Sequence, residues 1–358
     1  MPACLQFDRT LLVVVVGLTL FGLLMIFSVT TADAEPTFRY VVKQLIAVLI
    51  GLAAMRFLMF RNYRDWRNQR AVFAALGTAM TLLVLAWVFG VGANTNRFLR
   101  FGQISVQPSE IAKLSLILFL AYYLDGREEK LRDWRSLGGG ALVLAAFCLL
   151  VLGGRDLGTA LSLVVIAGVV LWTAGMRLRY FLLGGATVAV ACAAAVFLEP
   201  YRMQRLMTFL HPEADPQGAG FQIIQSEIAV GSGGLFGQGL MLGRQKMRFL
   251  PEAHTDFIFA VIGEELGMIG GLLVVLAFGV ILWRGLLAAQ RAPDAFGSYL
   301  ATGVTAMIVC QAMLNLGVVL AMLPTKGMPL PFVSYGGTAM ITCLAGAGLL
   351  LNVSQHAR

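Results

Sequence analysis

In Phe249–Gly270, FLPEAHTDFIFAVIGEELGMIG, a short polar run is followed by a long apolar run. The apolar run extends to Trp283, and its only charged residues are Glu264 and Glu265. This pattern predicts a membrane helix that begins at or next to Asp256. A carboxylate at that position either stabilises the helix N-terminus through the macrodipole or belongs to a functional site at the membrane boundary.

Small residues recur at helical spacing after Asp256. A helix that starts there places four of them on the same side as the carboxylate: Ala260, Gly263, Gly267 and Gly270. Such a stripe lets another helix or a ligand approach the backbone closely. We therefore predict that Asp256 lies at the mouth of a packed seam, while spacing alone does not decide between capping and function.

The composition is that of a polytopic membrane protein. The 358 residues are 58% hydrophobic and 13% charged, whereas soluble domains are about 45–50% apolar and about 25% charged. Ten apolar runs approach the length that crosses a bilayer: about 11–30, 40–60, 71–90, 107–124, 137–153, 157–175, 180–198, 257–283, 298–322 and 334–352. The first run lacks a small-residue cleavage site and is interpreted as a span, not as a signal peptide. We predict an all-α fold, a single membrane domain over residues 1–358 with about ten transmembrane helices.

Basic residues are concentrated in alternate loops between these runs. Arg61–Arg70 holds four Arg, and Asp125–Arg135 holds four basic residues. The positive-inside rule then places both termini in the cytoplasm and residues 199–256 outside, as one large extracytoplasmic loop. Basic residues in the loops on the cytoplasmic side account for the net charge of +8, and nucleic acid is not an expected partner.

Several cofactor classes are not indicated. The five Cys and three His form no cluster, so neither zinc nor haem is expected. The glycine-rich stretch Gly231–Gly239 has Phe236 where a dinucleotide fingerprint has its third glycine, and no strand precedes it. We interpret it as a flexible or tightly packed outer loop and expect no nucleotide.

Two ionisable residues lie inside the fourth apolar run. Glu110 and Lys113 are three residues apart and share a helix face. They form either a simple ion pair near the membrane edge or a functional or buried network. The cost of placing two charges in a span favours the second interpretation.

Further polar residues lie at the predicted outer ends of spans. Arg97 is suited to phosphate recognition but could equally extend toward lipid headgroups. Asp156 opens the sixth run and is interpreted first as a helix cap. The proline-rich segment Pro324–Pro331 carries Lys326 and is followed by Ser334 at the start of the last run, which predicts a rigid, shaped rim. Lys326 is either the cation of this rim or a solvated loop lysine, and the sequence does not decide between the two.

The sequence resembles the SEDS family (shape, elongation, division and sporulation), the polytopic cell-wall polymerases of bacteria. The resemblance covers nearly the whole chain. It rests on these motifs: Asn94–Arg97, Gln107–Lys113 (QPSEIAK), Asp156–Ala160 (DLGTA), Ser232–Gly237 (SGGLFG), Leu250–Gly267 (LPEAHTDFIFAVIGEELG), Leu323–Gly327 (LPTKG) and Pro331–Gly337 (PFVSYGG).

Within the family, two branches are indicated. Three segments resemble the division branch (FtsW-like), namely Gly243–Lys246, Ile262–Glu265 and Pro324–Gly327, whereas Pro329–Val333 resembles the elongation branch (RodA-like). The division branch is favoured. One difference is that the family usually has Pro before the Asp of DLGTA, where this chain has Arg155.

The resemblance implies a peptidoglycan glycosyltransferase that polymerises lipid II into glycan strands at the outer face of the bacterial cytoplasmic membrane. It implies that Asp256 is catalytic, and we expect it to act as the general base. The family's paired residues of the fourth span correspond to Glu110 and Lys113, which complete the candidate catalytic set.

The leaving diphosphate requires positive charge. Arg97, Lys113 and Lys326 are the candidate cations for this role. Arg97 and Lys326, together with Asp156 and Ser334, are the candidate substrate-binding residues. A divalent cation (Mg²⁺ or Mn²⁺) with Asp256 as a weak ligand is an alternative source of charge.

The resemblance also implies partners. These are a single-span class B penicillin-binding protein, which is a transpeptidase, and other membrane proteins of the divisome or elongasome. Two other functions stay open: a lipid II flippase, which needs polar groups through the membrane depth, and a scaffold that would tolerate loss of Asp256.

Overall fold

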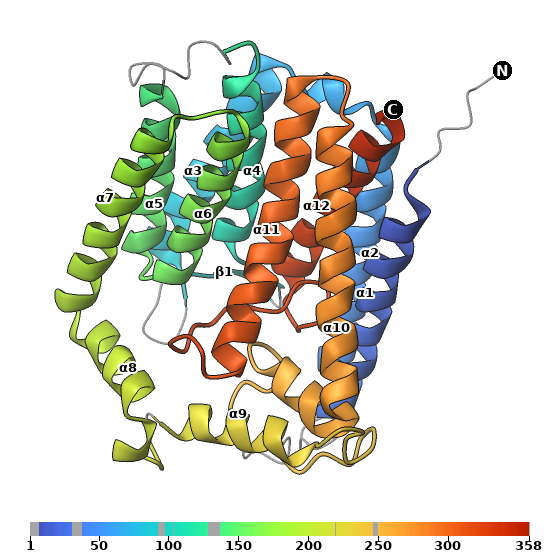
Figure 1. The fold of residues 1–358 in the computed structure, drawn as a ribbon, viewed down its shortest axis with the longest axis vertical. Helices are drawn as coiled ribbons and strands as arrows, with labels where there is room; N and C mark the ends of the chain where they lie inside the picture. Colours follow the sequence, from blue (N-terminus) through green and yellow to red (C-terminus); the bar gives the residue numbers. More distant parts are fainter. Residues whose placement is uncertain are drawn as a thin grey trace.

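The computed structural model describes residues 7–30, 38–91, 97–102, 104–127, 137–218, 220–245 and 250–357. These residues form an elongated bundle of helices, as predicted (Figure 1). Each predicted span corresponds to one helix: α1 (Arg9–Thr30), α2 (Phe38–Phe60), α3 (Gln69–Phe89), α4 (Pro108–Leu124), α5 (Gly138–Gly153), α6 (Leu157–Thr173), α7 (Leu178–Phe197), α10 (Ile258–Gln290), α11 (Ala295–Val319) and α12 (Gly337–His356). Seven of them are long and apolar enough to cross a membrane, and α5 and α6 are shorter apolar helices. The protein is therefore a multi-pass membrane protein.

Helices α4, α11 and α12 form the centre of the bundle, where most of their residues are buried. Small residues allow this packing. A Cβ atom at Gly348 would lie 2.5 Å from the carbonyl oxygen of Met55, so α12 and α2 pack backbone to backbone at this point. Helix α7 differs from the rest because none of its residues is buried, and it stands at the edge of the bundle (Figure 1).

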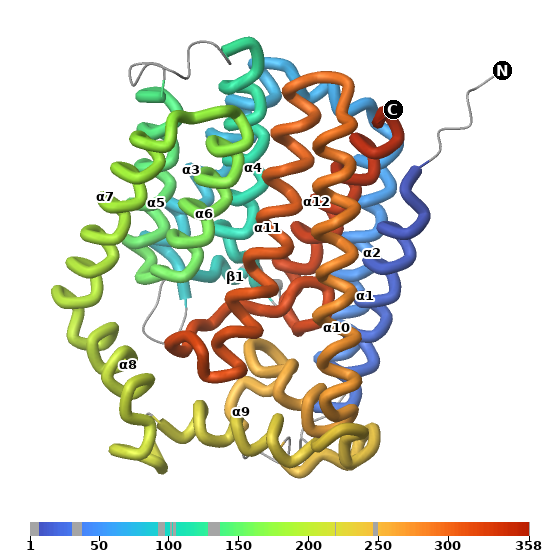
Figure 2. Tube along the Cα trace, in the orientation of Figure 1, coloured from blue at the N-terminus to red at the C-terminus, as the bar shows by residue number. Residues whose placement is uncertain are grey.

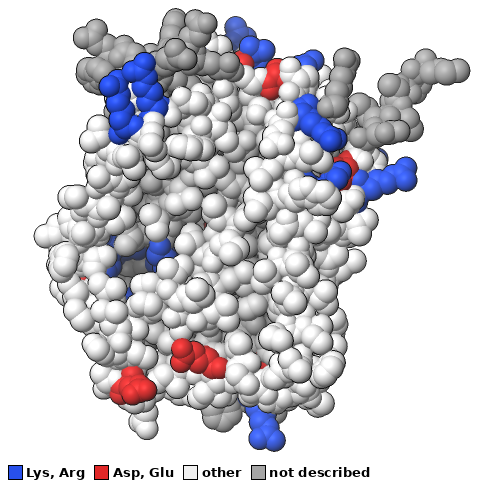
Figure 3. Space-filling view, viewed as in Figure 1, with Lys and Arg blue, Asp and Glu red and all other residues white. Residues whose placement is uncertain are grey.

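Both ends of the described chain lie at the same end of the bundle. The backbone N–H of Asp8 donates to Ser354 Oγ over 3.4 Å, and the N–H of Tyr63, between α2 and α3, donates to Asn352 Oδ1 over 3.1 Å. Lys and Arg side chains gather at this end in Figure 3, and the middle of the visible face is almost free of charge outside one hollow. This distribution matches the basic loops that the sequence analysis places in the cytoplasm.

The opposite end contains more regular structure than the predicted single loop. Residues 199–256 include helix α8 (Pro200–Leu210), a short 3₁₀ helix (Pro212–Ala214) and helix α9 (Phe221–Ser232). They extend across the end of the bundle away from the termini (Figure 2). A short antiparallel hairpin, β1 (Leu99–Phe101) with β2 (Ile104–Val106), precedes α4.

Helix α10 is interrupted at Gly267, whose φ of 68° and ψ of −166° are not helical. Only glycine adopts this conformation readily. The N–H groups of Met268 and Ile269 donate instead to the carbonyls of Gly234 and Leu235, over 2.9 and 3.2 Å.

The interruption also leaves two carbonyl groups without their helical donors. In an unbroken helix the N–H groups of Met268 and Ile269 would donate to the carbonyls of Glu264 and Glu265. The carbonyls of Glu264 and Glu265 accept from the N–H groups of Gln238 and Gly239, over 2.9 and 3.0 Å. The glycine-rich loop therefore replaces the lost helical hydrogen bonds, and the tightly packed interpretation of Gly231–Gly239 is confirmed.

This interruption corrects the predicted seam. Gly263 and Gly267 do permit close approach, of Val230 and of the glycine-rich loop respectively. The break, however, ends the common helix face at Gly267, and Asp256 lies outside the helix. Asp256 consequently does not lie at the mouth of a stripe that continues to Gly270.

Candidate active site

Asp256 lies in a turn two residues before the first residue of α10. The residue at the helix N-cap is Phe257, and no side chain makes a capping hydrogen bond. Asp256 therefore does not form a side-chain cap of α10, whereas a contribution through the macrodipole stays a prediction. Its carboxylate lies instead against the linker between α11 and α12, where a Cβ atom at Gly327 would be 3.1 Å from Oδ2 of Asp256 and 3.7 Å from Nη1 of Arg97.

A cavity of about 270 Å³ opens next to this position. Figure 3 shows it as a hollow with basic side chains inside, near α7 and α8. The turn before α6, the ends of α7 and α8, and the α11–α12 linker supply most of its lining: Arg97, Arg155, Asp156, Leu157, Gly158, Val196, Glu199, Tyr201, Arg202, Arg205, Leu206, Pro324, Thr325, Lys326, Gly327 and Met328.

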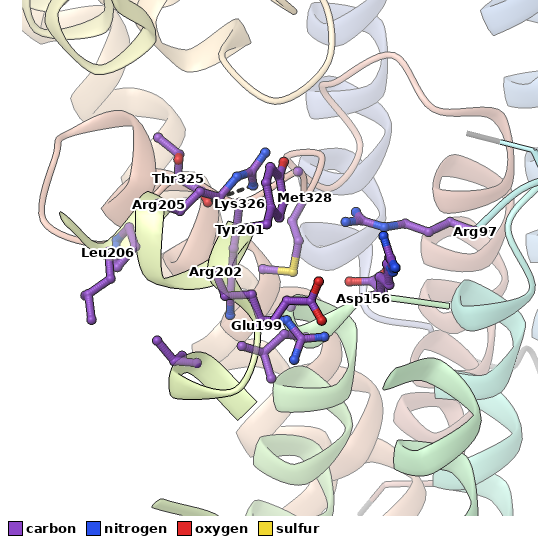
Figure 4. Close-up of a pocket in the computed structure, with 16 residues that line it drawn as sticks. Arg97, Asp156, Glu199, Tyr201, Arg202, Arg205, Leu206, Thr325, Lys326 and Met328 are labelled. Carbon is purple, nitrogen blue, oxygen red and sulfur yellow. Dashed lines mark hydrogen bonds and ion pairs between the residues drawn. The ribbon is translucent and has the colours of Figure 1, made fainter. Parts of the chain in front are cut away.

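Positive charge predominates in the cavity. Its lining contains five basic side chains and two acidic ones. The basic residues are Arg97, Arg155, Arg202, Arg205 and Lys326, and the acidic residues are Asp156 and Glu199. In Figure 4, Arg97 enters from one side and the α8 residues enter from the other. The enclosed, partly apolar walls strengthen the attraction for an anion relative to open water.

Asp156 has two roles in this geometry. Its Oδ1 accepts from the Thr159 N–H over 3.0 Å and its Oδ2 from Thr159 Oγ1 over 2.8 Å, which confirms the predicted cap of α6. Oδ2 also lies 3.9 Å from Arg97 Nε. Arg97 Nε is itself buried and makes no hydrogen bond within the described part of the chain, so the Arg97 guanidinium has donor capacity left for a ligand.

Arg202 and Arg205 were not among the predicted site residues. They are three residues apart on α8, and Arg205 Nη1 donates to the Thr325 carbonyl over 3.1 Å. Residues 199–256 were predicted to form one loop, and for this reason neither arginine was a candidate. Pro200 at the start of the helix, followed by basic residues at helical spacing, is the signal that could have found them.

Arg155 also lines the cavity, and its φ of 61° lies in the left-handed region. A proline cannot adopt this angle, since its ring fixes φ near −65°. The turn between α5 and α6 therefore has a shape that depends on a residue other than proline at this position.

The surroundings of Asp256 alter its acidity. Burial, followed by the negative charge of Glu252, raises the pKa of Asp256 from 3.8 to about 7, although Arg97 and Arg205 act in the opposite direction. Burial also lowers the pKa of Lys326, against the effect of Asp156. A carboxylate with a pKa near neutrality is suited to take a proton and later to release it.

Glu110 and Lys113 form a buried ion pair. Lys113 Nζ lies 2.8 Å from Glu110 Oε1, and each side chain is 3% exposed. Nζ also donates to Gln311 Oε1 on α11 over 2.5 Å. Neither residue is among those that line the cavity. The buried-network interpretation describes the position of the pair, and its catalytic role stays a prediction.

Ser334 does not line the cavity either. Its Oγ accepts from the N–H of Leu330 over 2.8 Å, and its carbonyl accepts from Gln44 Nε2 over 3.2 Å. These bonds hold the turn before α12 against α2. Ser334 thus has a supporting role in the fold, and its contact with the substrate stays a prediction.

The described residues contain no group of three His, Cys, Asp or Glu side chains that could hold a metal ion. Asp256 thus has no neighbouring set of protein ligands within that part of the chain. A cation at this position would need ligands from the substrate.

Residues 8–358 match the FtsW/RodA/SpoVE family, which is described as "Cell cycle protein". The chain belongs to this family. Among its FtsW/RodA/SpoVE relatives, it is 42% identical to the "Probable peptidoglycan glycosyltransferase FtsW" of Geobacter metallireducens, over 98% of this chain and 95% of the relative. It is 40% identical to "Stage V sporulation protein E" of Bacillus subtilis, over 98% of each chain.

Solved structures share the FtsW/RodA/SpoVE fold. A chain from the structure described as "Structural coordination of polymerization and crosslinking by a peptidoglycan synthase complex" has a TM-score of 0.80 and 32% identity, with 98% of each chain covered. The rod shape determining protein RodA of Thermus thermophilus has a TM-score of 0.73 and 28% identity, with 99% of this chain and 98% of that chain covered. The fold and the family predicted from the sequence are confirmed.

Proposed function

We propose that this protein is a peptidoglycan glycosyltransferase that polymerises lipid II at the outer end of the bundle. The observation that carries the proposal is the position of Asp256 beside a cavity with an excess of positive charge. A base and an anion-binding site are the two elements that transfer of a sugar from a lipid diphosphate requires. The names of the relatives support the same activity.

The reaction forms a bond between the 4-hydroxyl oxygen of one sugar and the anomeric carbon of another. The bond between that carbon and the diphosphate oxygen breaks, and the electron pair leaves with the diphosphate. In our proposal Asp256 accepts the hydroxyl proton, while Arg97 and Lys326 hold the diphosphate, assisted by Arg202 and Arg205. Fixed cations placed where charge develops stabilise the transition state without reorganisation.

A divalent cation is a further part of the proposal. Mg²⁺ prefers oxygen ligands and usually keeps several waters, with one or two carboxylates and substrate phosphates. One Asp256 oxygen together with the diphosphate oxygens fits that preference. Such an ion would add positive charge at the leaving group.

We also propose that the chain lies in the bacterial cytoplasmic membrane with both termini in the cytoplasm. The basic end of the bundle supports this orientation, and it places the cavity outside, where lipid II presents its sugars. A class B penicillin-binding protein is the proposed partner, since the matched synthase complex couples polymerisation to crosslinking. Other divisome or elongasome proteins are further candidates.

The test is polymerisation of purified lipid II by the purified chain, with and without a partner transpeptidase. We expect polymer from the native chain and almost none from Asp256→Asn, because loss of a general base costs about 10²–10⁴ in rate. Glu213→Gln removes an exposed outer carboxylate and serves as the matched control, with normal activity.

Near-normal polymer from well-folded Asp256→Asn would remove Asp256 as the base. If the native chain makes no polymer with any partner yet moves lipid II across vesicle membranes, the flippase function replaces the polymerase. Absence of both activities, with retained partner binding, would leave the scaffold function.

A further inference from the structure

We propose that Asn315 is a positioning residue that fixes the turn of Asp256 against the linker that carries Lys326. Asn315 lies on α11 and is 2% exposed. Its Nδ2 donates to the carbonyl of Asp256 over 2.7 Å and to the carbonyl of Met328, also over 2.7 Å. One side-chain amide therefore joins two segments that are distant in sequence: the turn of Asp256 and the linker that lines the cavity.

The orientation of this amide is determined by its partners. Both neighbours are carbonyl oxygens, so only the NH₂ group can face them. Asn315 Oδ1 then lies buried without a hydrogen-bond partner among the described residues. A buried unsatisfied acceptor costs stability, and the two bonds made by Nδ2 are the compensation visible in the structure.

Gln311 provides a natural comparison, because it lies one helical turn earlier on α11. Its Nε2 donates to the carbonyl of Pro329 over 2.9 Å, and its Oε1 accepts from Lys113. Gln311 thus bonds to the same linker as Asn315, but within the described part of the chain no hydrogen bond joins it to the Asp256 turn. Loss of either amide should loosen the linker, whereas only loss of Asn315 should also release the turn.

The consequence for catalysis rests on the proposed function. The base must be held at a fixed distance from the cations that bind the diphosphate, and a misplacement of about 1 Å can cost as much as 10²-fold in rate. Asn315 sets this distance through two backbone groups and does not touch the substrate site itself. Its loss should therefore lower kcat more than it raises KM for lipid II.

The first experiment measures structure, independently of activity. Hydrogen–deuterium exchange of Asn315→Leu, which is close in size but has no donor, should increase in peptides that cover Glu252–Phe257 and Lys326–Met328. Gln311→Leu should increase exchange only in the linker peptide. Thr305→Val, which removes a buried hydroxyl elsewhere on α11, should change neither peptide.

The second experiment measures polymerisation. Asn315→Leu should reduce kcat by about tenfold to a hundredfold with a smaller change in KM, and Asn315→Ser, which keeps one donor, should be intermediate. If Asn315→Leu does not fold, Asn315→Ser carries both tests. Native exchange at Glu252–Phe257 in a folded variant, or a kcat within twofold of native, overturns the proposal. A native chain without polymerase activity would refute the proposed function instead, and the exchange data would still decide the role of Asn315.

Discussion

Asp256 and Gly327 lie against each other although they are far apart in the sequence: a Cβ atom at residue 327 would be 3.1 Å from Asp256 Oδ2. The absence of a side chain at Gly327 lets the carboxylate lie under the linker and beside Arg97. The same linker carries Lys326, so the candidate base and two candidate diphosphate ligands are packed around one glycine.

Gly327→Ala tests this packing. The new methyl group must displace the carboxylate by a few tenths of an ångström, and we expect polymerisation to fall about tenfold with the fold retained. Gly336→Ala is the matched control, because it lies in the same linker, has extended φ, and its Cβ would be 3.6 Å from the nearest atom. Equal activity of the two variants would show that the position of Asp256 does not depend on Gly327.

Asp256→Asn should change stability as well as activity. The pKa of Asp256 is raised from 3.8 in the unfolded reference to about 7 in the folded protein, so ionisation of the folded protein costs stability. That cost is absent below about pH 4, grows as the pH rises toward about 7, and is constant above it. Asn cannot ionise, so the variant should match native thermal stability at acidic pH and exceed it at pH 8. If the difference in thermal stability between the two proteins is the same at every pH in this range, the raised pKa of Asp256 is contradicted.

Lys113→Met tests the buried pair. It leaves the Glu110 carboxylate buried without its cation, which should cost about 3–5 kcal/mol of stability. The double variant Glu110→Leu with Lys113→Met removes both charges and should recover most of that loss, as replaced buried pairs often do. Because neither residue lines the cavity, turnover per folded molecule should recover as well. A stable but inactive double variant would return the pair to the catalytic role predicted from the sequence.

Arg155→Gly tests the extra cation of the cavity. Glycine adopts a φ of 61° without steric cost, so the variant should be more stable by about 1 kcal/mol. Loss of the guanidinium should raise KM for lipid II severalfold and leave kcat nearly unchanged, since Arg155 contributes charge but does not touch Asp256. Arg155→Asn, which also tolerates this backbone conformation, should behave in the same way. An unchanged KM in both variants would exclude Arg155 from substrate binding.

The orientation in the membrane can be tested with single cysteines in a cysteine-free background. Gln217 and Asn68 are both exposed, and they lie at opposite ends of the bundle. An impermeant thiol reagent added to intact cells should label a cysteine at Gln217 but not one at Asn68, until the membrane is permeabilised. Labelling of Asn68 in intact cells would reverse the orientation and exclude outer-face chemistry.

The sequence by itself determined the class of fold and the order of the helices. Apolar runs of bilayer length predict helices because a chain in hydrocarbon must satisfy its backbone hydrogen bonds internally. All ten predicted runs correspond to helices for this reason. The family motifs also made Asp256 the candidate catalytic residue, and the position of Asp156 at the start of the sixth run predicted the cap that it forms.

The tertiary structure decided the arrangement of the site. The break at Gly267 depends on hydrogen bonds from Gly234–Gly239, and no helical periodicity reports a bond to a distant loop. The turn of Asp256 is held by Asn315 from another helix, and the cavity combines Arg97 with Arg205 of α8. Local sequence encodes which segments become helices, whereas these contacts depend on which segments lie close together after packing. For this reason the sequence could not distinguish Lys113, which is buried in the interior, from Lys326, which lines the cavity.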